Sequence, residues 1–355
     1  MKLHGIILVA GEGTRLRPLT FTTPKPLIPL LGKPLIIHIL ESLRNSGISD
    51  ISVVIGYLGH LFKEVIGNGS SIGINVKYVV QPQRLGIADA IYRAVSETQS
   101  SDPIIVYLGD NFFGENILRF INEFKKDYCD VFIVLTKFKD PTKFGYVILE
   151  NGKVKKLIEK PKEPPPGGYT LTGFYAFRDP DIVKIAFKDL KPSWRGEYEI
   201  TDLIQWFIDR SYEVCYTITN SWWKDMGTPD DLLDLLYLVL DEISPRIEGE
   251  VLGDVRGRVI VEKGALIEGS VLGPVYVGKD VFVGKHAIIE HYVDMEHGVR
   301  VESGYLSRTL VLNKSRISLN NARLVESIIG AESEVTLNPG IYKLIVGERS
   351  IIRGL

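Results

Sequence analysis

The C-terminal third of this chain carries a six-residue repeat, a pattern typical of the β-helix. Small aliphatic side chains recur at this interval in two series, Val275, Val281, Ala287 and Val293, and Val271, Val277, Val283 and Ile289. In the hexapeptide β-helix, three such repeats make one triangular coil. The pattern therefore predicts a left-handed parallel β-helix domain over residues 246–355.

Residues 1–245 show a different pattern, in which short apolar runs alternate with amphipathic, helix-like stretches. The apolar runs lie at 5–9, 51–56, 76–81, 103–109 and 131–138. This alternation predicts an α/β domain with a Rossmann-like, mostly parallel sheet and helices on both faces. Ligands bind beyond the carboxyl ends of the strands in such sheets. We therefore expect Gly11–Arg15, Gln81 and Asp110 to share one edge of the sheet.

Two local signals refine the second half of this domain. Asn151-Gly152 between two apolar runs predicts a tight hairpin. Thr228, followed by Pro229 and two aspartates, predicts the start of a helix that runs to about residue 243.

Length and composition limit the classes of protein to consider. A chain of 355 residues is too long for one core, so we expect two domains, residues 1–245 and 246–355. The net charge of −2 gives no attraction to nucleic acid or to anionic membranes. No uncharged apolar stretch reaches the roughly 18 residues of a membrane span, and no signal peptide is recognisable. With Cys129 and Cys215 interpreted as buried thiols, we expect a cytoplasmic protein.

The first apolar run ends in a glycine-rich turn, residues 11–15, with the sequence Gly-Glu-Gly-Thr-Arg. Glycines allow backbone N–H groups to approach an anion closely, and a fixed cation meets its charge. The turn matches neither the dinucleotide fingerprint nor the P-loop. By itself it fits a phosphate-binding turn and an ordinary surface turn equally well.

Two carboxylates follow predicted strands and are candidate ligands for a divalent cation. Asp110 ends the run at 103–109, and Asp225 lies between tryptophans and a glycine. Mg²⁺ is typically held by one or two carboxylates together with phosphate oxygens. The alternative for Asp110 is that it caps a following helix together with Asn111, and for Asp225 that it is a turn or cap residue.

Several cations accompany these carboxylates. Lys25 lies between two prolines, which restrict its backbone to an extended form. Lys160 precedes a proline, which again favours an extended backbone, and Arg195 is a further basic residue. Each of them, like Arg15, could be an ordinary surface charge. Two carboxylates, a metal ion and several cations in one cleft would suit transfer between phosphates, because there the protein mainly positions groups and neutralises charge.

These residues lie in segments that resemble the sugar nucleotidyltransferases, and most of all the glucose-1-phosphate thymidylyltransferases of the long form with a C-terminal β-helix. The matching segments are LVAGEGTRLRP, TTPKPLIPLLGKP, QPQRLGIADA, LGDN, GYV…IEKP, LTGFYAF, RGEYEITD and WWKDMGTPDDLL. They occur in family order over residues 3–240. One departure is Ala10-Gly11, where the family often has two glycines.

The resemblance implies a reaction and a set of roles. An oxygen of a sugar 1-phosphate attacks the α-phosphate of a nucleoside triphosphate, and pyrophosphate leaves. Asp110 and Asp225 would hold Mg²⁺, with Arg15, Lys25 and Lys160 among the catalytic groups. The implied nucleotide-binding residues are Leu8, Gly11, Gly13, Thr14, Arg15, Gln81, Gly86 and Asp110. The implied sugar-phosphate-binding residues are Gly145, Glu159, Lys160, Gly173, Arg195 and Trp223.

The leading interpretation is an enzyme that makes dTDP-glucose from dTTP and glucose 1-phosphate. Two alternatives stay open within the same class, namely use of UTP or another sugar phosphate, and a bifunctional enzyme that adds acetyl transfer in the β-helix. His286 and His291 would then deserve attention, although a structural role fits them better. The alternative from another class is a non-catalytic regulatory subunit. The intact set of cleft charges argues for catalysis, and we expect self-association through the β-helix.

Overall fold

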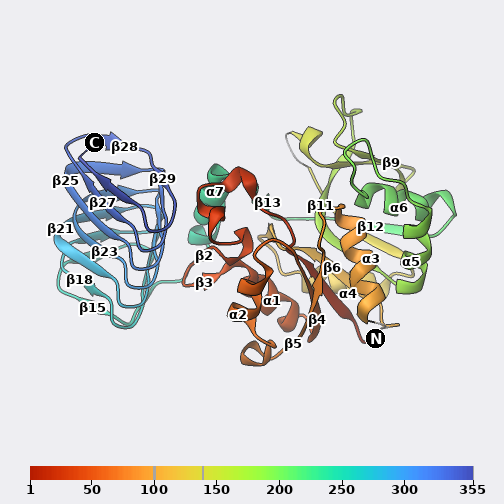
Figure 1. Cartoon of the computed structure of the whole chain (residues 1–355), viewed down its shortest axis with the longest axis horizontal. Helices are drawn as coiled ribbons and strands as arrows, with labels where there is room; N and C mark the ends of the chain where they lie inside the picture. The colour runs from red at the N-terminus through yellow and green to blue at the C-terminus, as the bar shows by residue number, and fades with distance from the viewer. Residues whose placement is uncertain (99–100, 138–139, 355) are drawn as a thin grey trace. The chain divides into compact units, whose positions relative to one another are not determined.

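The computed structural model describes residues 1–98, 101–137 and 140–354, and its backbone contacts divide the chain into two units (Figure 1). The first unit comprises Met1–Glu12 and Ile36–Asp225, and the second comprises Gly13–Leu35 and Met226–Leu355. This grouping differs from the boundary expected at residue 245, because it joins residues 13–35 and 226–245 to the C-terminal coils. The boundary at 245 itself stays a prediction.

The first unit is built on a nine-stranded mixed sheet with the order β10-β9-β11-β6-β1-β4-β5, extended by β8 and β12. Its strands are β1 (His4–Leu8), β4 (Asp50–Ile55), β5 (Asn75–Val80), β6 (Ile104–Leu108), β8 (Val131–Thr136), β9 (Gly145–Glu150), β10 (Lys153–Glu159), β11 (Tyr169–Phe177) and β12 (Val214–Ile218). The neighbours β5, β4, β1 and β6 are parallel, and β11 joins β6 in the antiparallel direction. Each predicted apolar run forms one strand, although residue 138 of the last run lies outside the described residues.

Helices cover both faces of this sheet. They are α1 (Leu35–Asn45), α2 (Gly59–Ile66), α3 (Ile87–Thr98), α4 (Leu118–Lys126), α5 (Pro180–Asp189) and α6 (Ile200–Asp209). On β11, Tyr175 belongs to a core that includes apolar residues of α3, α5 and α6, whereas its neighbour Phe174 contacts Phe120 of α4. Because adjacent strand residues point to opposite faces, α4 covers the other side. The predicted α/β class is confirmed.

The local signals of this unit are also confirmed. β9 and β10 pair across Asn151 and Gly152, both of which have positive φ, as a type I′ hairpin turn requires. A two-stranded sheet of β7 (Asn111–Phe113) and β13 (Trp223–Asp225) joins two segments far apart in the sequence.

No helix in the described part of the chain is long and apolar enough to cross a membrane. Cys129 is a buried free thiol, as expected, whereas Cys215 is free but only half-buried, so the interpretation of Cys215 as a buried thiol is wrong.

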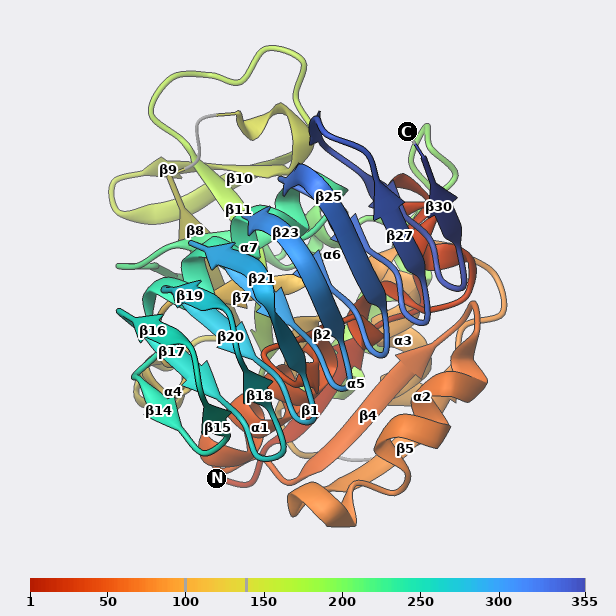
Figure 2. The same ribbon diagram turned by 90° about the vertical axis from the view of Figure 1, so that its left-hand side faces the viewer.

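The second unit contains the coils of a parallel β-helix, whose stacked strands are seen face-on in Figure 2. The strands are β14 (Arg246–Ile247), β15 (Glu250–Val251), β16 (Asp254–Arg256), β17 (Val259–Val261), β18 (Leu266–Ile267), β19 (Ser270–Leu272), β20 (Val275–Val277), β21 (Phe282–Glu290), β22 (Val293–Met295), β23 (Arg300–Ser307), β24 (Leu310–Val311), β25 (Arg316–Val325), β26 (Ile328–Ile329), β27 (Glu334–Leu337), β28 (Ile341–Tyr342), β29 (Ile345–Val346) and β30 (Ile351–Arg353). Val259 pairs with Val275, and Val275 pairs with Val293, so successive coils take 16 and 18 residues. This length corresponds to about three hexads a coil.

The side chains of the six-residue repeat fill the interior of these coils. All eight members of the two predicted series are buried and belong to one core. The coils continue beyond residue 290 to β30, and the isoleucine-rich segments at 328–329, 344–346 and 351–352 belong to these later coils. The arrangement is consistent with the predicted left-handed β-helix.

The second unit also contains α7 (Pro229–Asp241) and a loop of residues 13–35, which we call the Arg15–Lys25 loop. Thr228 caps α7 in a capping box with Asp231, as the sequence indicates. The Arg15–Lys25 loop folds into three 3₁₀ turns, η1 (Thr14–Leu16), η2 (Leu19–Phe21) and η3 (Lys25–Leu27), and a hairpin of β2 (Pro29–Leu30) and β3 (Lys33–Pro34). Lys25 begins η3, so the extended backbone predicted for it is wrong.

Candidate active site

A cavity of about 290 Å³ opens in the first unit beyond the carboxyl ends of β1, β5 and β6. Eight of the residues expected from the sequence line it, namely Leu8, Gly11, Gln81, Gly86, Asp110, Glu159, Lys160 and Arg195. The other lining residues are Ala10, Arg84, Ile87, Ala90, Leu108, Glu197, Glu199 and Ile200. The sheet edge expected to join Gly11–Arg15, Gln81 and Asp110 is therefore present for Gly11, Gln81 and Asp110, whereas residues 13–15 belong to the second unit.

One side of the cavity is formed by the segment between β5 and α3. The Gln81 side chain is buried, and its Nε2 donates to the Gly86 carbonyl at 3.1 Å and to Asp89 Oδ2 at 2.8 Å. Since both partners are acceptors, the amide nitrogen of Gln81 must face them. The donor capacity of Gln81 is thus used inside the protein.

Gly86 is the position in this segment that only glycine fits. Its φ is +102°, and a Cβ there would overlap the backbone of Tyr198. Tyr198 in turn donates its N–H to the Leu85 carbonyl at 2.6 Å and accepts the N–H of Ala88 at 3.1 Å. The close approach therefore joins the start of α3 to the loop that carries Arg195, Glu197 and Glu199.

The two candidate metal ligands are joined by one amide. Nδ2 of Asn111 donates to Asp110 Oδ1 at 2.8 Å and to Asp225 Oδ1 at 3.2 Å. Oδ1 of the same side chain accepts the indole N–H of Trp223 at 2.8 Å. Asn111 is buried, and the pairing of β7 with β13 places it opposite Asp225. The structure thus brings Asp110 and Asp225 together, and it corrects the alternative in which Asp110 caps a helix, because strand β7 follows it.

Gly173 and Trp223 both contact Asn111, the residue that joins Asp110 and Asp225, and they are not among the residues that line the cavity. A Cβ on Gly173 would come within 2.6 Å of Asn111 Oδ1, so the absence of a side chain makes room for the amide. Trp223 is buried, with its ring edge-on to Phe144 at 5.1 Å between centroids. Both residues therefore contact the groups around the carboxylates.

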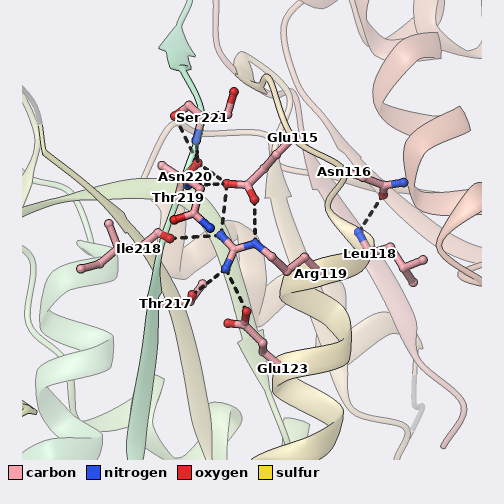
Figure 3. A network of polar contacts seen from close by, with 10 residues as sticks. All are labelled: Glu115, Asn116, Leu118, Arg119, Glu123, Thr217, Ile218, Thr219, Asn220 and Ser221. Carbon is pink, nitrogen blue, oxygen red and sulfur yellow. Dashed lines mark hydrogen bonds and ion pairs between the residues drawn. The ribbon is translucent and has the colours of Figure 1, made fainter.

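A network of charged groups fixes the segment that leads into β13 (Figure 3). Arg119, on α4, donates to Glu115 at 2.6 Å, to Glu123 at 2.8 Å and to the Ile218 carbonyl at 3.1 Å. Glu115 also accepts the backbone N–H of Asn220 at 2.8 Å. Hydrogen bonds to charged groups are the stronger kind. The network thereby ties the chain just before β13, and so Asp225, to the start of α4.

The opposite side of the cavity holds a cluster of charged groups around Arg195. Its guanidinium lies 3.5 Å from Glu159, 3.2 Å from Glu199 and 3.0 Å from Glu197. Lys160 Nζ is 3.6 Å from Glu159. Burial and the nearby Glu199 raise the pKa of Glu159 above its usual value, against the opposing effect of the cations. Arg195 thus acts here as the common partner of three carboxylates.

The backbone of Lys160 is unusual for a residue that precedes proline. Its φ is +43°, so the extended conformation expected before Pro161 is wrong. The Lys160 N–H donates to the Phe144 carbonyl at 3.1 Å, which helps to hold this conformation. Strained residues of this kind cluster at functional sites.

Gly145 and Tyr175 lie close to Glu159. A Cβ on Gly145 would lie 2.8 Å from the methyl group of Thr201, whose hydroxyl donates to Glu159 at 3.1 Å. Tyr175 is fully buried, and burial together with Glu159, Asp110 and Asp225 raises the pKa of its hydroxyl. The Tyr175 hydroxyl therefore stays protonated within the apolar core next to the site.

The charges that line the cavity nearly balance. Three are basic, on Arg84, Lys160 and Arg195, and four are acidic, on Asp110, Glu159, Glu197 and Glu199. A triphosphate carries several negative charges, so binding it in this cavity calls for additional positive charge. A divalent cation and basic residues of other segments are the two sources to consider.

The remaining expected site residues belong to the second unit. Thr14 and Arg15 are exposed and lie in η1, directly after Gly13, whose φ is +63°. A Cβ on Gly13 would be 3.3 Å from Cβ of Lys25, so the glycine-rich turn packs against the lysine segment. Gly11, which lines the cavity, precedes Arg15 by four residues.

Sequence reasoning missed three residues that the structure places at the site. Asn111 joins the two carboxylates, and Glu197 and Glu199 surround Arg195. A signal for Asn111 was present, since a polar amide directly follows Asp110 at the end of an apolar strand. Glu197 and Glu199 alternate with Tyr198, but only the fold shows that they face Arg195.

Comparison with known proteins gives consistent results. The family model described as nucleotidyl transferase matches residues 4–242, more than half of the chain. A glucose-1-phosphate thymidylyltransferase from Streptomyces griseus is 35% identical over 355 residues, which cover 98% of each chain.

Two further relatives resemble parts of the chain. A bifunctional protein GlmU from Methanococcus maripaludis strain C5 is 33% identical over 270 residues, 74% of this chain and 61% of that relative. A crystal structure from Bacillus anthracis, in complex with sucrose and assigned to the glucose-1-phosphate thymidylyltransferases, superposes with a TM-score of 0.59. It is 35% identical and covers 65% of this chain and 93% of that one.

Proposed function

The chain belongs to the nucleotidyl transferase family, and from this premise we propose that it transfers a nucleotidyl group from dTTP to glucose 1-phosphate, releasing pyrophosphate. The observation that carries this proposal is the cavity itself. It combines the Gln81–Gly86 segment, the carboxylate Asp110 and the basic residue Lys160 in one space. The similarity to a thymidylyltransferase over 98% of the chain supports the choice of substrates.

In the proposed reaction, a phosphate oxygen of the sugar 1-phosphate attacks the α-phosphorus of the nucleotide. A new P–O bond forms as the bond to the β-phosphate oxygen breaks, and the electron pair leaves with pyrophosphate. Lys160 would orient the sugar phosphate, and Glu159 would accept hydrogen bonds from sugar hydroxyls. Arg15 and Lys25 are assigned to the pyrophosphate by their motifs. The protein thus acts mainly by positioning groups and stabilising charge.

Asp110 and Asp225 are the proposed ligands of Mg²⁺. Two carboxylates held together by the Asn111 amide offer the hard oxygen donors that this cation prefers, with substrate phosphates supplying further ligands. Within the described ranges, no group of three or more His, Cys, Asp or Glu side chains could hold a metal ion. Bound there, the cation would neutralise negative charge on the phosphates. The side chains that line the cavity supply no net positive charge for this purpose.

Gln81 is the residue proposed to read the base. Because its Nε2 is engaged by Gly86 and Asp89, the group that it can offer to a ligand is its carbonyl oxygen. An acceptor at this position pairs with the N3–H of thymine or uracil and repels the unprotonated N3 of cytosine. Discrimination between dTTP and UTP then rests on one methyl group and one hydroxyl, for which a pocket supplies only about 1–3 kcal/mol.

The test crosses nucleotides and sugar phosphates in a pyrophosphate-release assay with Mg²⁺. dTTP, UTP, CTP, ATP and GTP are each combined with glucose, galactose, mannose and N-acetylglucosamine 1-phosphates. The proposal expects the highest kcat/KM for dTTP with glucose 1-phosphate and the lowest rates for CTP among the pyrimidines. Lack of turnover with every pair would instead favour the regulatory subunit.

The bifunctional alternative is favoured by one observation, the similarity to the bifunctional protein GlmU. This chain spans 61% of that relative. His286 and His291 are exposed on the coils, and the His291 ring lies 3.0 Å from the Gly273 carbonyl. Acetyl-CoA consumption with glucosamine 1-phosphate would support this alternative, and its absence alongside dTTP turnover would count against it.

We also propose that the protein self-associates through its β-helix. Large apolar side chains are exposed on the first and last coils, among them Ile247, Leu252, Ile341 and Ile351. Covering such patches is a common reason for symmetric association. Light scattering of the full chain should therefore give a mass of at least twice 39.8 kDa, and the monomer mass would contradict self-association.

A further inference from the structure

The tip of the hairpin in the Arg15–Lys25 loop is attached to the β-helix by two buried acidic side chains. The N–H of Leu31 donates to Asp294 Oδ2 at 2.8 Å, and the N–H of Gly32 donates to Glu296 Oε1 at 3.0 Å. Asp294 is 0% exposed and Glu296 is 2% exposed. Acidic residues are rarely buried this completely unless they are paired or hydrogen-bonded, and here the hairpin backbone donates the hydrogen bonds.

The fit between the tip and the coils is close. A side chain on Gly32 would overlap the hydroxyl of Tyr276, which lies on the neighbouring coil in register with Asp294. Leu31 has a φ of +52°, a conformation that costs a non-glycine residue energy. Such strain persists only where the surroundings determine the conformation. A two-residue turn between the paired Leu30 and Lys33 requires positive φ at Leu31 and Gly32, and the acidic pair on the coil accepts both N–H groups that this turn presents.

Two more contacts attach the same loop to the last coils. Thr23, two residues before Lys25, donates its hydroxyl proton to Glu348. Pro18, three residues after Arg15, packs closely on Gly347, because a Cβ on Gly347 would lie 3.2 Å from Cβ of Pro18. The first of these attachment points along the chain thus lies three residues after Arg15, and the points at residues 23 and 31–32 lie on either side of Lys25.

We propose that the β-helix positions the loop that carries Arg15 and Lys25, with Asp294, Glu296 and Glu348 as positioning residues for the transfer reaction. The inference rests on the proposed function, which assigns these two cations to the pyrophosphate. The loop itself consists of short 3₁₀ turns and a two-residue hairpin, elements that have little stability of their own. The coils supply the rigidity that a preorganised cation requires.

The first test compares substitutions that remove or keep the acceptor. In Asp294→Leu with Glu296→Leu, the hairpin N–H groups lose their partners. We expect kcat to fall about 10- to 100-fold, as for a small misplacement of a catalytic group, with KM for glucose 1-phosphate within about twofold of wild type. Asp294→Asn with Glu296→Gln keeps a carbonyl oxygen at each position and should retain most of kcat. The matched control is Glu268→Gln, an exposed acid on another coil, with unchanged rates.

The second test is a double-mutant cycle with Lys25→Ala. If the coil residues act through Lys25, the loss from the double leucine variant should shrink in the Lys25→Ala background. Full additivity, or a wild-type kcat in the double leucine variant, would overturn the inference. A wild-type rate in Lys25→Ala alone would instead overturn the assigned role of Lys25, so the two failures are distinguishable.

A milder substitution covers the case in which the double leucine variant does not fold. Glu348→Ala removes the half-buried acceptor of the Thr23 hydroxyl and leaves the coil core untouched. Its kcat should fall by a few-fold, and this loss should also shrink in the Lys25→Ala background. A loss of the same factor in both backgrounds would contradict the positioning role.

Discussion

Asn111 gives the sharpest prediction about the active site, because one buried amide joins both proposed metal ligands. Replacing it with alanine removes its hydrogen bonds to Asp110 and Asp225 and leaves the Trp223 indole N–H without this acceptor. A hydrogen bond to a charged group contributes about 1.5–3 kcal/mol. Both carboxylates are only half-buried, so we take the lower end, which gives about 3 kcal/mol for the two bonds.

That energy sets the size of the expected effect. About 1.4 kcal/mol corresponds to a factor of ten, so Asn111→Ala should lower kcat/KM about 10²-fold. The Mg²⁺ concentration that gives half-maximal activity should rise, because the two carboxylates lose the group that holds them side by side. The assay is steady-state pyrophosphate release over a series of Mg²⁺ concentrations, at a temperature where circular dichroism shows the variant to be folded.

The matched control is Asn122→Ala on the exposed face of α4, which should behave like the wild type. The reasoning would be refuted if Asn111→Ala retained kcat/KM within about twofold and kept the wild-type response to Mg²⁺. The carboxylates would then need no common amide, and their assignment as a joint metal site would lose its structural support.

Three further predictions concern other parts of the chain. Lys25→Ala should lower kcat/KM about 10²-fold or more, the loss typical of one preorganised charge contact; a near-wild-type rate of pyrophosphate release would contradict its role. Gly86→Ala should destabilise the protein by about 2 kcal/mol or more in denaturant unfolding, because it combines backbone strain with overlap on Tyr198. The control Gly167→Ala, at a φ of +85° but with open space around the site, should cost less. Burial raises the pKa of Glu296 from 4.5 to about 7, so the folded state binds more protons than the unfolded state in this range. The free energy of unfolding should therefore fall as pH rises from about 4.5 to about 7. Glu296→Gln should flatten this dependence, and an equal slope in both proteins would contradict the prediction.

Local signals predicted much of the fold. The hexad positions such as Val275 and Val277 point inward because the repeat length matches the coil. Asn151-Gly152 forms the expected turn because both residues tolerate positive φ. Thr228 caps α7 because its side chain accepts a backbone N–H of the first turn. Each of these outcomes depends on residues close in the sequence.

Features set by distant contacts were not predictable. The bridging role of Asn111 requires β13 to pair with β7, more than a hundred residues apart. The positive φ of Lys160 opposes the ordinary preference before proline, and its N–H is held by the Phe144 carbonyl. Burial of Asp294 and Glu296 follows from a hairpin near the other end of the chain. A sequence pattern does not contain these pairings.

The attachment of the Arg15–Lys25 loop to the coils changes how the domain boundary is understood. The predicted break at residue 245 places the β-helix and the Arg15–Lys25 loop in different domains. The contacts of Thr23, Leu31 and Gly32 show that the β-helix supports a segment of the N-terminal part of its own chain. Truncation at residue 245 is therefore expected to affect this loop as well as any assembly.

The most direct test of the central claim is product analysis after incubation of the purified protein with dTTP, glucose 1-phosphate and Mg²⁺. Mass spectrometry and a pyrophosphate assay on the same sample should give dTDP-glucose and pyrophosphate in equal amounts, with neither product formed when one substrate is left out. Pyrophosphate release without the sugar phosphate, or no product with any nucleotide, would contradict nucleotidyl transfer in this cleft.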